Sequence, residues 1–364
     1  MEYTVRSLGS FSEMKYGKMP NKKMPSDKGK YPIFSGYRVV GYCDECNIGE
    51  QQLVVVARGV GGTGDVKLSP GACFLTNLSI AVSVDESVAL KKYLYYYFLK
   101  NNLRYLDSGS AQSQITIGDL KNVEVPLPSI ETQKKVVSIL DAIDEKINNN
   151  IAINDNLQQQ AMALYAEMFL NSSDNNVTSG TLSDIAAITM GQSPSGSSYN
   201  EDGVGEVFYQ GRAEFGFRFP KRRLFTTEPK RMAETGDVLL SVRAPVGDLN
   251  VAYERCCIGR GLGAIHSKTG HSSFVLYTMF ALRSQLDVFN GEGTVFGSIN
   301  RDALNAIPID IPPVTEIDQF EAVAHPIDEL IRANYEENCR LEAIRDSLLP
   351  KLMSGEIDVS AVNL

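Results

Sequence analysis

The sequence lacks the signatures of the common enzymes. It has no Walker phosphate-binding loop, no His-Glu-x-x-His zinc motif, no serine nucleophile elbow and no Asp/Asn-Pro-Pro-Tyr/Phe motif of an amino-methyltransferase. Histidine is scarce: His266 and His271 lie five residues apart in a polar stretch, and His325 lies in an acidic segment. Neither arrangement indicates a metal ligand set or a general base. These absences favour a binding protein over an enzyme.

Long apolar runs are also missing. No stretch of about 18 apolar residues occurs, and the first residues, MEYTVRSLGS, lack the basic-then-apolar layout of a signal peptide. We therefore expect a cytoplasmic protein without a membrane partner, whose six cysteines are reduced thiols. Cys43 and Cys46 form one CxxC, but no second pair accompanies it, so we predict no metal site.

One glycine-rich segment matches a nucleotide-binding pattern only superficially. Gly59, Gly61 and Gly64 satisfy the GxGxxG spacing, but Pro70 follows within six residues of Gly64. The helix whose N-terminus would hold a pyrophosphate is therefore missing. Short strands around glycine turns are the better interpretation.

The acidic charge is confined to parts of the chain. Of the net charge of −9, residues 1–129 carry +3 and residues 180–311 carry −1, whereas residues 130–179 carry −4 and residues 312–364 carry −7. The overall charge would argue against a nucleic-acid partner, but its distribution does not. We expect near-neutral globular units with local basic clusters, connected by acidic helices.

A long amphipathic segment occurs twice. Residues 128–170 are introduced by Pro126 and Pro128 and recur 184 positions later, without a gap, for over forty residues. Apolar residues recur at alternating spacings of four and three, which indicates a heptad seam that needs a facing helix. The predicted pairing residues are Ile143, Ile147, Asn150, Asn154 and Leu157 in the first copy and Ile327, Ile331, Asn334, Asn338 and Leu341 in the second.

The polar seam positions predict how the helices pair. In an antiparallel pair, Asn150 should lie near Asn338 and Asn154 near Asn334, whereas a parallel pair would set Asn150 beside Asn334. The alternative is that the seam drifts onto Ile151 and Ile153 and leaves the asparagines in solvent. Pro326 stands where the first copy has Ala142, so a kink or a late helix start is possible there.

The globular parts repeat as well. Leu182, Gly191 and Pro194 stand where Leu8, Gly17 and Pro20 stood, at an offset of 174 that grows to 184 later in the unit. We predict an α+β protein with two α/β domains, 1–129 and 180–311, in a tandem pseudo-two-fold repeat. The segments 130–179 and 312–364 supply two long helices that form an antiparallel coiled coil.

Basic loops suggest a polyanionic ligand. Residues 15–30 hold six lysines around Tyr16, and residues 209–223, YQGRAEFGFRFPKRR, are basic and aromatic together. Both compositions suit contact with phosphates and bases. For the lysine loop, a simple solvated loop explains the composition equally well.

The order of motifs resembles a known family. Leu-x-Asp-Ile is followed by GQSPSG at 191–196, a strand ending in arginine, an aromatic helix, GSAQ at 109–112, VPLP at 125–128, Gln-x-x-Val at 133–136 and LDAIDEKI at 140–147, with the plan present twice. This order resembles the specificity subunit of type I restriction–modification enzymes, over the entire chain. Departures are modest: Ile317 replaces the glutamine in the second copy, and the first unit lacks a clear SPSG.

The resemblance implies a function and partners. It implies two target-recognition domains, each reading one half of a split double-stranded DNA sequence, and two long helices that dock two modification subunits. Restriction subunits would join through the modification subunits. No cofactor is expected in this chain, because S-adenosylmethionine should bind the modification partner.

Carried over by position, the resemblance also implies which residues face DNA. The loops are 15–30, 58–64 and 110–114 in the first unit and 191–198, 209–223 and 243–247 in the second. Arginine, glutamine and asparagine can contact base edges with two hydrogen bonds, whereas lysines more often position the protein. The candidate residues are Lys15, Tyr16, Lys22, Lys23, Arg58, Gln112, Gln114, Gln192, Ser193, Ser195, Gln210, Arg212, Arg218, Lys221, Arg222 and Arg243.

Two other functions fit parts of the pattern. A scaffold could use two globular heads and a rod to hold proteins without any DNA specificity. A nuclease with an unrecognised active site is the weaker alternative, because no catalytic constellation is visible.

Overall fold

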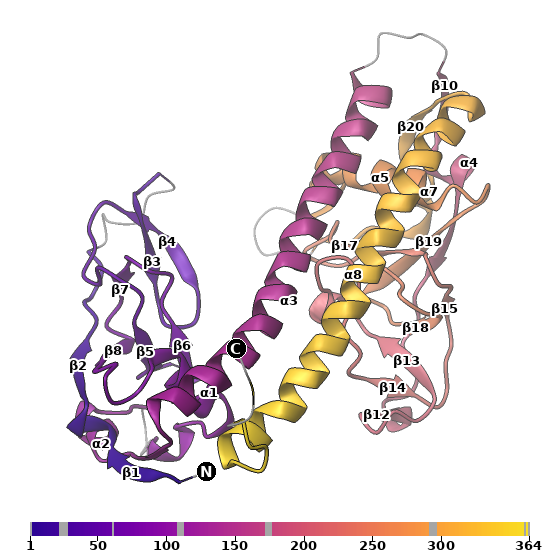
Figure 1. Ribbon diagram of the computed structural model, residues 1–364. Coiled ribbons are helices and arrows are strands. Elements are labelled where there is room, and N and C mark those ends of the chain that lie inside the picture. Colours follow the sequence, from indigo (N-terminus) through magenta and orange to yellow (C-terminus); the bar gives the residue numbers. More distant parts are fainter. Residues whose placement is uncertain are drawn as a thin grey trace. The chain divides into compact units, whose positions relative to one another are not determined.

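The computed structural model describes residues 2–21, 28–59, 62–107, 113–171, 177–290, 297–359 and 362. The chain divides into two compact units (Figure 1). The first unit comprises Met1–Asn148 and Asn338–Leu364, and the second comprises Asn149–Glu337. Each unit therefore contains one globular head and one part of each long helix.

The head of the first unit is built from short strands and two helices. Its elements are β1 (Thr4–Ser7), η1 (Leu8–Ser10), β2 (Ser12–Tyr16), β3 (Tyr31–Phe34), β4 (Val39–Cys43), β5 (Leu53–Val56), β6 (Val66–Leu68), β7 (Phe74–Leu75), β8 (Ser79–Val84), α1 (Lys91–Lys100), η2 (Arg104–Leu106), α2 (Ile117–Lys121) and β9 (Glu124–Leu127). One sheet has the order β2-β8-β5-β6, a second has β4-β3-β7, and β1 pairs with β9.

The head of the second unit follows the same plan. Its elements are β10 (Thr178–Thr181), α4 (Leu182–Ile185), β11 (Ala186–Met190), η4 (Gly196–Ser198), β12 (Tyr199–Asn200), β13 (Glu206–Tyr209), η5 (Arg212–Glu214), β14 (Phe225–Thr226), β15 (Met232–Ala233), β16 (Val238–Ser241), β17 (Leu249–Val251), β18 (Cys256–Ile258), β19 (Leu262–Ser267), α5 (Ser272–Ala281), α6 (Arg283–Asp287), η6 (Val288–Asn290), α7 (Arg301–Asn305) and β20 (Pro308–Ile311). The sheet order β11-β19-β16-β17 matches β2-β8-β5-β6.

The repeat extends to single hydrogen bonds. The backbone N–H of Leu8 donates to Val123 at 2.8 Å, and that of Leu182 donates to Ile307 at 2.9 Å, at the equivalent place. Both leucines are fully buried. The repeated leucine in the sequence, Leu8 or Leu182, therefore marks a core position at the start of each head.

The second sheet differs between the heads. In the first unit β3 pairs in parallel with β7, and in the second unit β13 pairs in parallel with β18, so the central parallel pair is shared. Around that pair the second head adds strands, giving the order β12-β14-β13-β18-β15. The ten extra residues of the second copy thus fall between β11 and β16, as the changing sequence offset predicts.

The two long helices form where the heptad pattern predicts them. α3 covers Ile130–Tyr165 and continues as one π-helical turn, η3 (Ala166–Leu170), and α8 covers Val314–Ser354. Helix α8 begins at Val314, twelve residues before Pro326, and continues past this proline, so the helix does not start late. Within the described residues, neither these helices nor any other has the length and apolar character needed to cross a membrane.

The asparagines of the seam lie inside the second unit's helix pair. Asn150 and Asn154 are 1% and 5% exposed, whereas Ile151 and Ile153 are 53% and 46% exposed, so the seam does not drift onto the isoleucines. The Asn334 side chain donates to Asn154 Oδ1 at 2.8 Å, and Asn150 donates to Glu337 at 2.7 Å. As the residue number rises along α3, from Asn150 to Asn154, the number of the contacting residue on α8 falls, from Glu337 to Asn334. The two helices are therefore antiparallel here.

The remaining seam residues line the same helix faces to different depths. Ile147 and Ile331 are buried. Ile143, Leu157, Ile327, Asn338 and Leu341 are partly exposed.

Each head shares its hydrophobic core with the helices. In the first unit Val136 and Leu140 of α3 and Leu352 of α8 pack into the same cluster as Leu8 and Tyr93. In the second unit Ala161 of α3 and Phe320 of α8 join Leu182 and Phe274. Burial of the helix stripe is thus divided between the partner helix and the head.

Polar side chains also fix the aromatic helix of each head to a long helix. Gln133 of α3 is fully buried, accepts the backbone N–H of Leu90 at 2.8 Å and donates to the carbonyls of Val88 and Pro128. These bonds satisfy groups at the start of α1. In the second unit Ile317 takes the glutamine position, and Glu321 instead accepts the backbone N–H groups of Ser273 and Phe274 at 3.1 and 2.9 Å, at the start of α5.

We expect Gln133→Ala to destabilise the first unit by about 1–3 kcal/mol, because it removes a fully buried side chain and leaves the N–H of Leu90 without its acceptor. The measurement is chemical denaturation of the full chain. Gln160→Ala is the matched control, since Gln160 is an exposed residue of the same helix. Equal stability of the two variants would contradict this role of Gln133.

Candidate nucleic-acid interface

The loop after β5 presents Arg58 in the first unit. Arg58 is exposed at the end of the strand, and its backbone pairs with that of Gln114 in an isolated bridge. Ser113 Oγ lies within hydrogen-bond distance of Thr63 Oγ1, at 2.6 Å, and of the Asp107 carboxylate, which ties the two segments together. Two candidate DNA-contacting residues, Arg58 and Gln114, are thereby brought side by side from positions far apart in the sequence.

The glycines of this loop have a packing role. A Cβ atom on Gly59 would lie 2.4 Å from the hydroxyl of Tyr37, and one on Gly62 would lie 2.2 Å from the Tyr37 ring. Gly59 also has φ of +140°. The glycine-rich pattern therefore reflects a close approach to Tyr37 and a left-handed backbone.

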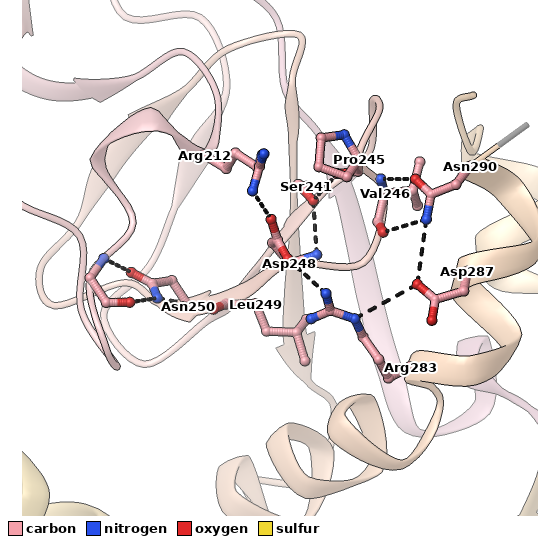
Figure 2. A network of polar contacts seen from close by, with 11 residues as sticks. Arg212, Ser241, Pro245, Val246, Asp248, Leu249, Asn250, Arg283, Asp287 and Asn290 are labelled. Carbon is pink, nitrogen blue, oxygen red and sulfur yellow. Dashed lines mark hydrogen bonds and ion pairs between the residues drawn. The ribbon is translucent and has the colours of Figure 1, made fainter. Parts of the chain in front are cut away.

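The loop after β16 repeats this arrangement in the second unit. Arg243 is exposed, and its backbone pairs with Ser298. Figure 2 shows how the following loop is held: Ser241 Oγ donates to the carbonyl of Pro245 at 2.8 Å, and Val246 exchanges two hydrogen bonds with the Asn290 side chain. Neither Arg58 nor Arg243 has an ion-pair partner among the described residues, so both guanidinium groups are available to a ligand.

An aspartate–arginine pair closes the loop in both units. Asp65 accepts Arg104 Nε and Nη2 at 3.0 and 2.9 Å. Asp248, at the equivalent place, accepts Arg283 Nη2 at 2.9 Å. These four residues were not predicted from the sequence, although a Gly-Asp pair ends the loop in both copies.

The second unit adds a further arginine to this pair. Arg212 lies in η5 directly after β13, its side chain is 49% exposed, and its Nη1 donates to Asp248. Gln210 is exposed two residues earlier, where its carbonyl accepts the N–H of Gly261. Arg212 and the 243–248 loop are therefore connected through Asp248.

The GQSPSG segment follows β11 in the same head. Gln192 is exposed and its backbone N–H donates to Ile258 at 2.9 Å, while Ser193 Oγ accepts the N–H of Arg260 at 3.2 Å. Ser195 is exposed and shares a 2.8 Å hydrogen bond with Ser197. The segment is thus anchored to the turn between β18 and β19 with Gln192 exposed.

One candidate residue does not face solvent. Arg218 was expected among the DNA-facing residues, but it is 4% exposed, and its guanidinium donates to Asp328 at 2.6 Å, to Gln158 at 3.1 Å and to Tyr277 at 3.3 Å. Burial by itself lowers the pKa of Arg218, but Asp328 and Tyr277 raise the pKa above its ordinary value. The expectation for Arg218 is corrected: it joins its segment to α3, α8 and α5 inside the unit.

The neighbours of Arg218 explain this placement. Phe219 is buried against Tyr253 and Tyr335, with ring centroids 5.6 and 5.0 Å apart. The basic and aromatic stretch 209–223 therefore divides: Arg218 and Phe219 are buried against neighbouring elements, whereas Gln210, Arg212 and residues 221–223 remain exposed.

The other basic candidates lie at the surface. Lys221 is exposed, and Arg222 is exposed with its Nη2 2.7 Å from Glu254. In the first unit Lys15 is exposed on β2, and the Tyr16 hydroxyl accepts the N–H of Ile117 at 3.3 Å. Lys22, Lys23 and Gln112 lie outside the described residues.

The family model for the type I restriction modification DNA specificity domain matches residues 1–159 and 175–336. The chain is 33% identical over 287 residues to a putative type I restriction enzyme MjaX specificity subunit from Methanocaldococcus jannaschii, covering 73% of this chain and 67% of that protein. It is 24% identical to the putative specificity subunit S.MpnORF638P of Mycoplasma pneumoniae, over 96% of each chain. The crystal structure of a type I restriction–modification S subunit from M. genitalium shares the fold, with a TM-score of 0.64, 19% identity and coverage of 97% and 96%.

Two specificity domains in tandem, joined by long helices, define a non-catalytic recognition subunit. This chain belongs to the family of type I restriction–modification specificity subunits. That family works with DNA and with modification and restriction subunits, which carry the enzyme activity.

We expect Arg218→Ala to destabilise the second unit by about 3–5 kcal/mol, because it leaves the Asp328 carboxylate without its buried cation. Chemical denaturation measures this loss. Lys221→Ala, an exposed neighbour, should leave stability within about 0.5 kcal/mol of the parent. Unchanged stability together with lost DNA binding would make Arg218 a DNA contact after all.

Proposed function

We propose that each unit reads one half of a split double-stranded DNA target. The exposed loop arginine, Arg58 or Arg243, would contact a guanine, and the segment bridged to it, at Gln114 or Ser298, would contact neighbouring bases. The observation that carries the proposal is the repeat of this arrangement: in each head an unpaired exposed arginine lies beside a second polar segment at the same place in the fold.

Charge supports the same division of roles. The net charges of residues 1–129 and 180–311 are +3 and −1, so the heads are close to neutral. Exposed basic side chains on the heads can therefore attract phosphates without opposition from a large acidic charge. Residues 130–179 and 312–364 sum to −4 and −7, which disfavours contact between the helices and phosphates. The helices therefore serve protein partners, and the heads serve DNA.

The helices also carry exposed apolar side chains suited to docking. On α8 of the second unit Val323 and Leu330 are 51% and 47% exposed and lie seven residues apart, on one face. In the first unit Ile344 of α8 is 47% exposed. We infer that the chain docks two modification subunits through these helix surfaces. The restriction subunits would then join through the modification subunits.

The half-site proposal is tested with the matched pair Arg58→Ala and Arg243→Ala. Selection from randomised duplexes by the full chain with its modification subunits should give two specified segments separated by unspecified bases. Each variant should lose about 1–3 kcal/mol of discrimination at one base pair. Arg58→Ala should affect one segment only, and Arg243→Ala the other.

Two results would count against this proposal. Variants that weaken binding to all duplexes alike would make both arginines phosphate contacts. Absence of any selected sequence with the parent complex would favour a protein scaffold.

The docking proposal predicts two modification subunits per chain by native mass spectrometry of the copurified complex. Leu330→Glu should release one of them, because the new charge loses its solvation on docking. Val204→Glu is the control: Val204 is 56% exposed in a loop of the second head, where its backbone bonds the Asn200 side chain, and its replacement should retain both subunits. A parent complex with a single modification subunit would refute the stoichiometry.

A further inference from the structure

Asp248 is the point at which three segments of the second head meet. Its carboxylate accepts Arg212 from η5 and Arg283 from α6, and its backbone N–H and carbonyl bond Ser241 at the end of β16 at 2.9 and 2.8 Å (Figure 2). The Asp248 side chain is 24% exposed, whereas those of Arg212 and Arg283 are each 49% exposed. Asp248 is therefore held by Ser241 and Arg283, and its carboxylate in turn holds Arg212, whose side chain is half-exposed.

Asp248 uses only part of the Arg212 guanidinium. The contact is made through Nη1, and Figure 2 shows one terminal nitrogen of Arg212 directed at the carboxylate. Among the described residues, Arg212 Nε and Nη2 have no hydrogen-bond partner. This free edge carries the two parallel N–H donors that match O6 and N7 of a guanine.

We propose that Asp248 is a positioning residue for base recognition: it holds Arg212 so that the Nε and Nη2 edge reads one guanine of the second half-site. The inference rests on the proposed function and adds a specificity mechanism to it. An unrestrained arginine has many rotamers, and ordering them opposes binding. An arginine already held by a fixed carboxylate loses less freedom when the base arrives, so the correct base is favoured more strongly over its competitors.

The first head provides an internal comparison. Asp65 occupies the equivalent place and accepts only Arg104 among the described residues, through both Nε and Nη2. Arg212 belongs to the stretch between β11 and β16, where the second copy is ten residues longer. The closing aspartate is thus common to both heads, and its use as a support for a reading arginine is special to the second.

The test replaces Asp248 by Asn in the full chain, assembled with its modification subunits, and measures binding to a randomised duplex library. Arg212→Ala should reduce preference at one base pair of the second half-site roughly 5- to 150-fold, the range that one two-pronged arginine contact provides. Asp248→Asn should reduce preference at the same base pair roughly 3- to 30-fold, because the guanidinium remains but is no longer held. The double variant should match Arg212→Ala alone, since both changes act on one contact.

Three control variants isolate the role of Asp248. Asp287→Asn makes the same charge change in the same network, 3.8 Å from Arg283 Nε and without touching Arg212, and should leave the preference unchanged. Asp65→Asn should leave the second half-site unchanged. Asp248→Glu keeps a carboxylate and should retain most of the preference. If Asp248→Glu and Asp248→Asn fold equally well, a merely structural role of the aspartate would not predict this difference between them.

The outcomes separate this inference from the proposed function. If the parent selects a split target but Asp248→Asn keeps the full preference, or alters every base pair alike, the positioning role is refuted and the DNA-reading function stands. Additive effects of Asp248→Asn and Arg212→Ala would also refute it. If the parent selects no sequence, the proposed function itself fails. Should Asp248→Asn not fold, Arg283→Gln removes one anchor of the carboxylate, and an unchanged preference in that variant would overturn the inference.

Discussion

The structure depends on the need to bury an apolar stripe that a single long helix cannot cover. α3 and α8 satisfy this need in two ways within each unit: they pack on each other and they enter the core of a head. Because the same helix residues serve both contacts, a head cannot be detached from its helix segments without exposing apolar surface. This is why the compact units contain parts of both helices rather than heads alone.

A partly buried tyrosine–aspartate contact accompanies this packing in each unit. Tyr96 donates to Asp144 at 2.7 Å, and Tyr277 donates to Asp328 at 2.9 Å. The aspartates have different cationic partners: Arg345 of α8 contacts Asp144, whereas Arg218 of the second head contacts Asp328. The repeat thus retains the carboxylate and the tyrosine but supplies the compensating charge from unrelated positions. A partly buried carboxylate is stabilised by a cation, but the fold does not dictate where that cation comes from.

The loops that we propose to read DNA are also held by ion pairs and hydrogen bonds. They are short connections between strands, and they are held by an aspartate–arginine pair, by side-chain contacts to the backbone and, in the first head, by the packing of glycines on Tyr37. The four-stranded sheet is therefore common to both heads, while the stretch between β2 and β5, or β11 and β16, differs in length and strand number between them. Under the proposed function, such an arrangement would allow two heads with one plan to present different side chains to DNA.

The sequence by itself determined the elements whose signals are periodic or repeated. The heptad spacing gave both long helices, and the internal repeat placed Leu8 with Leu182 and Arg58 with Arg243, because duplicated chains fold alike. It also favoured the burial of Asn154 beside Asn334, since a seven-residue period assigns these positions to the helix interface. Only the tertiary structure decided that Arg218 is buried and that Asp248 contacts Arg212 and Arg283. The stretch 209–223 has no period, so composition could not show that Arg218 and Phe219 turn inward while Arg212 stays at the surface. Asp248, Arg212 and Arg283 come from three separate segments, and the contact among them exists only once the chain has folded.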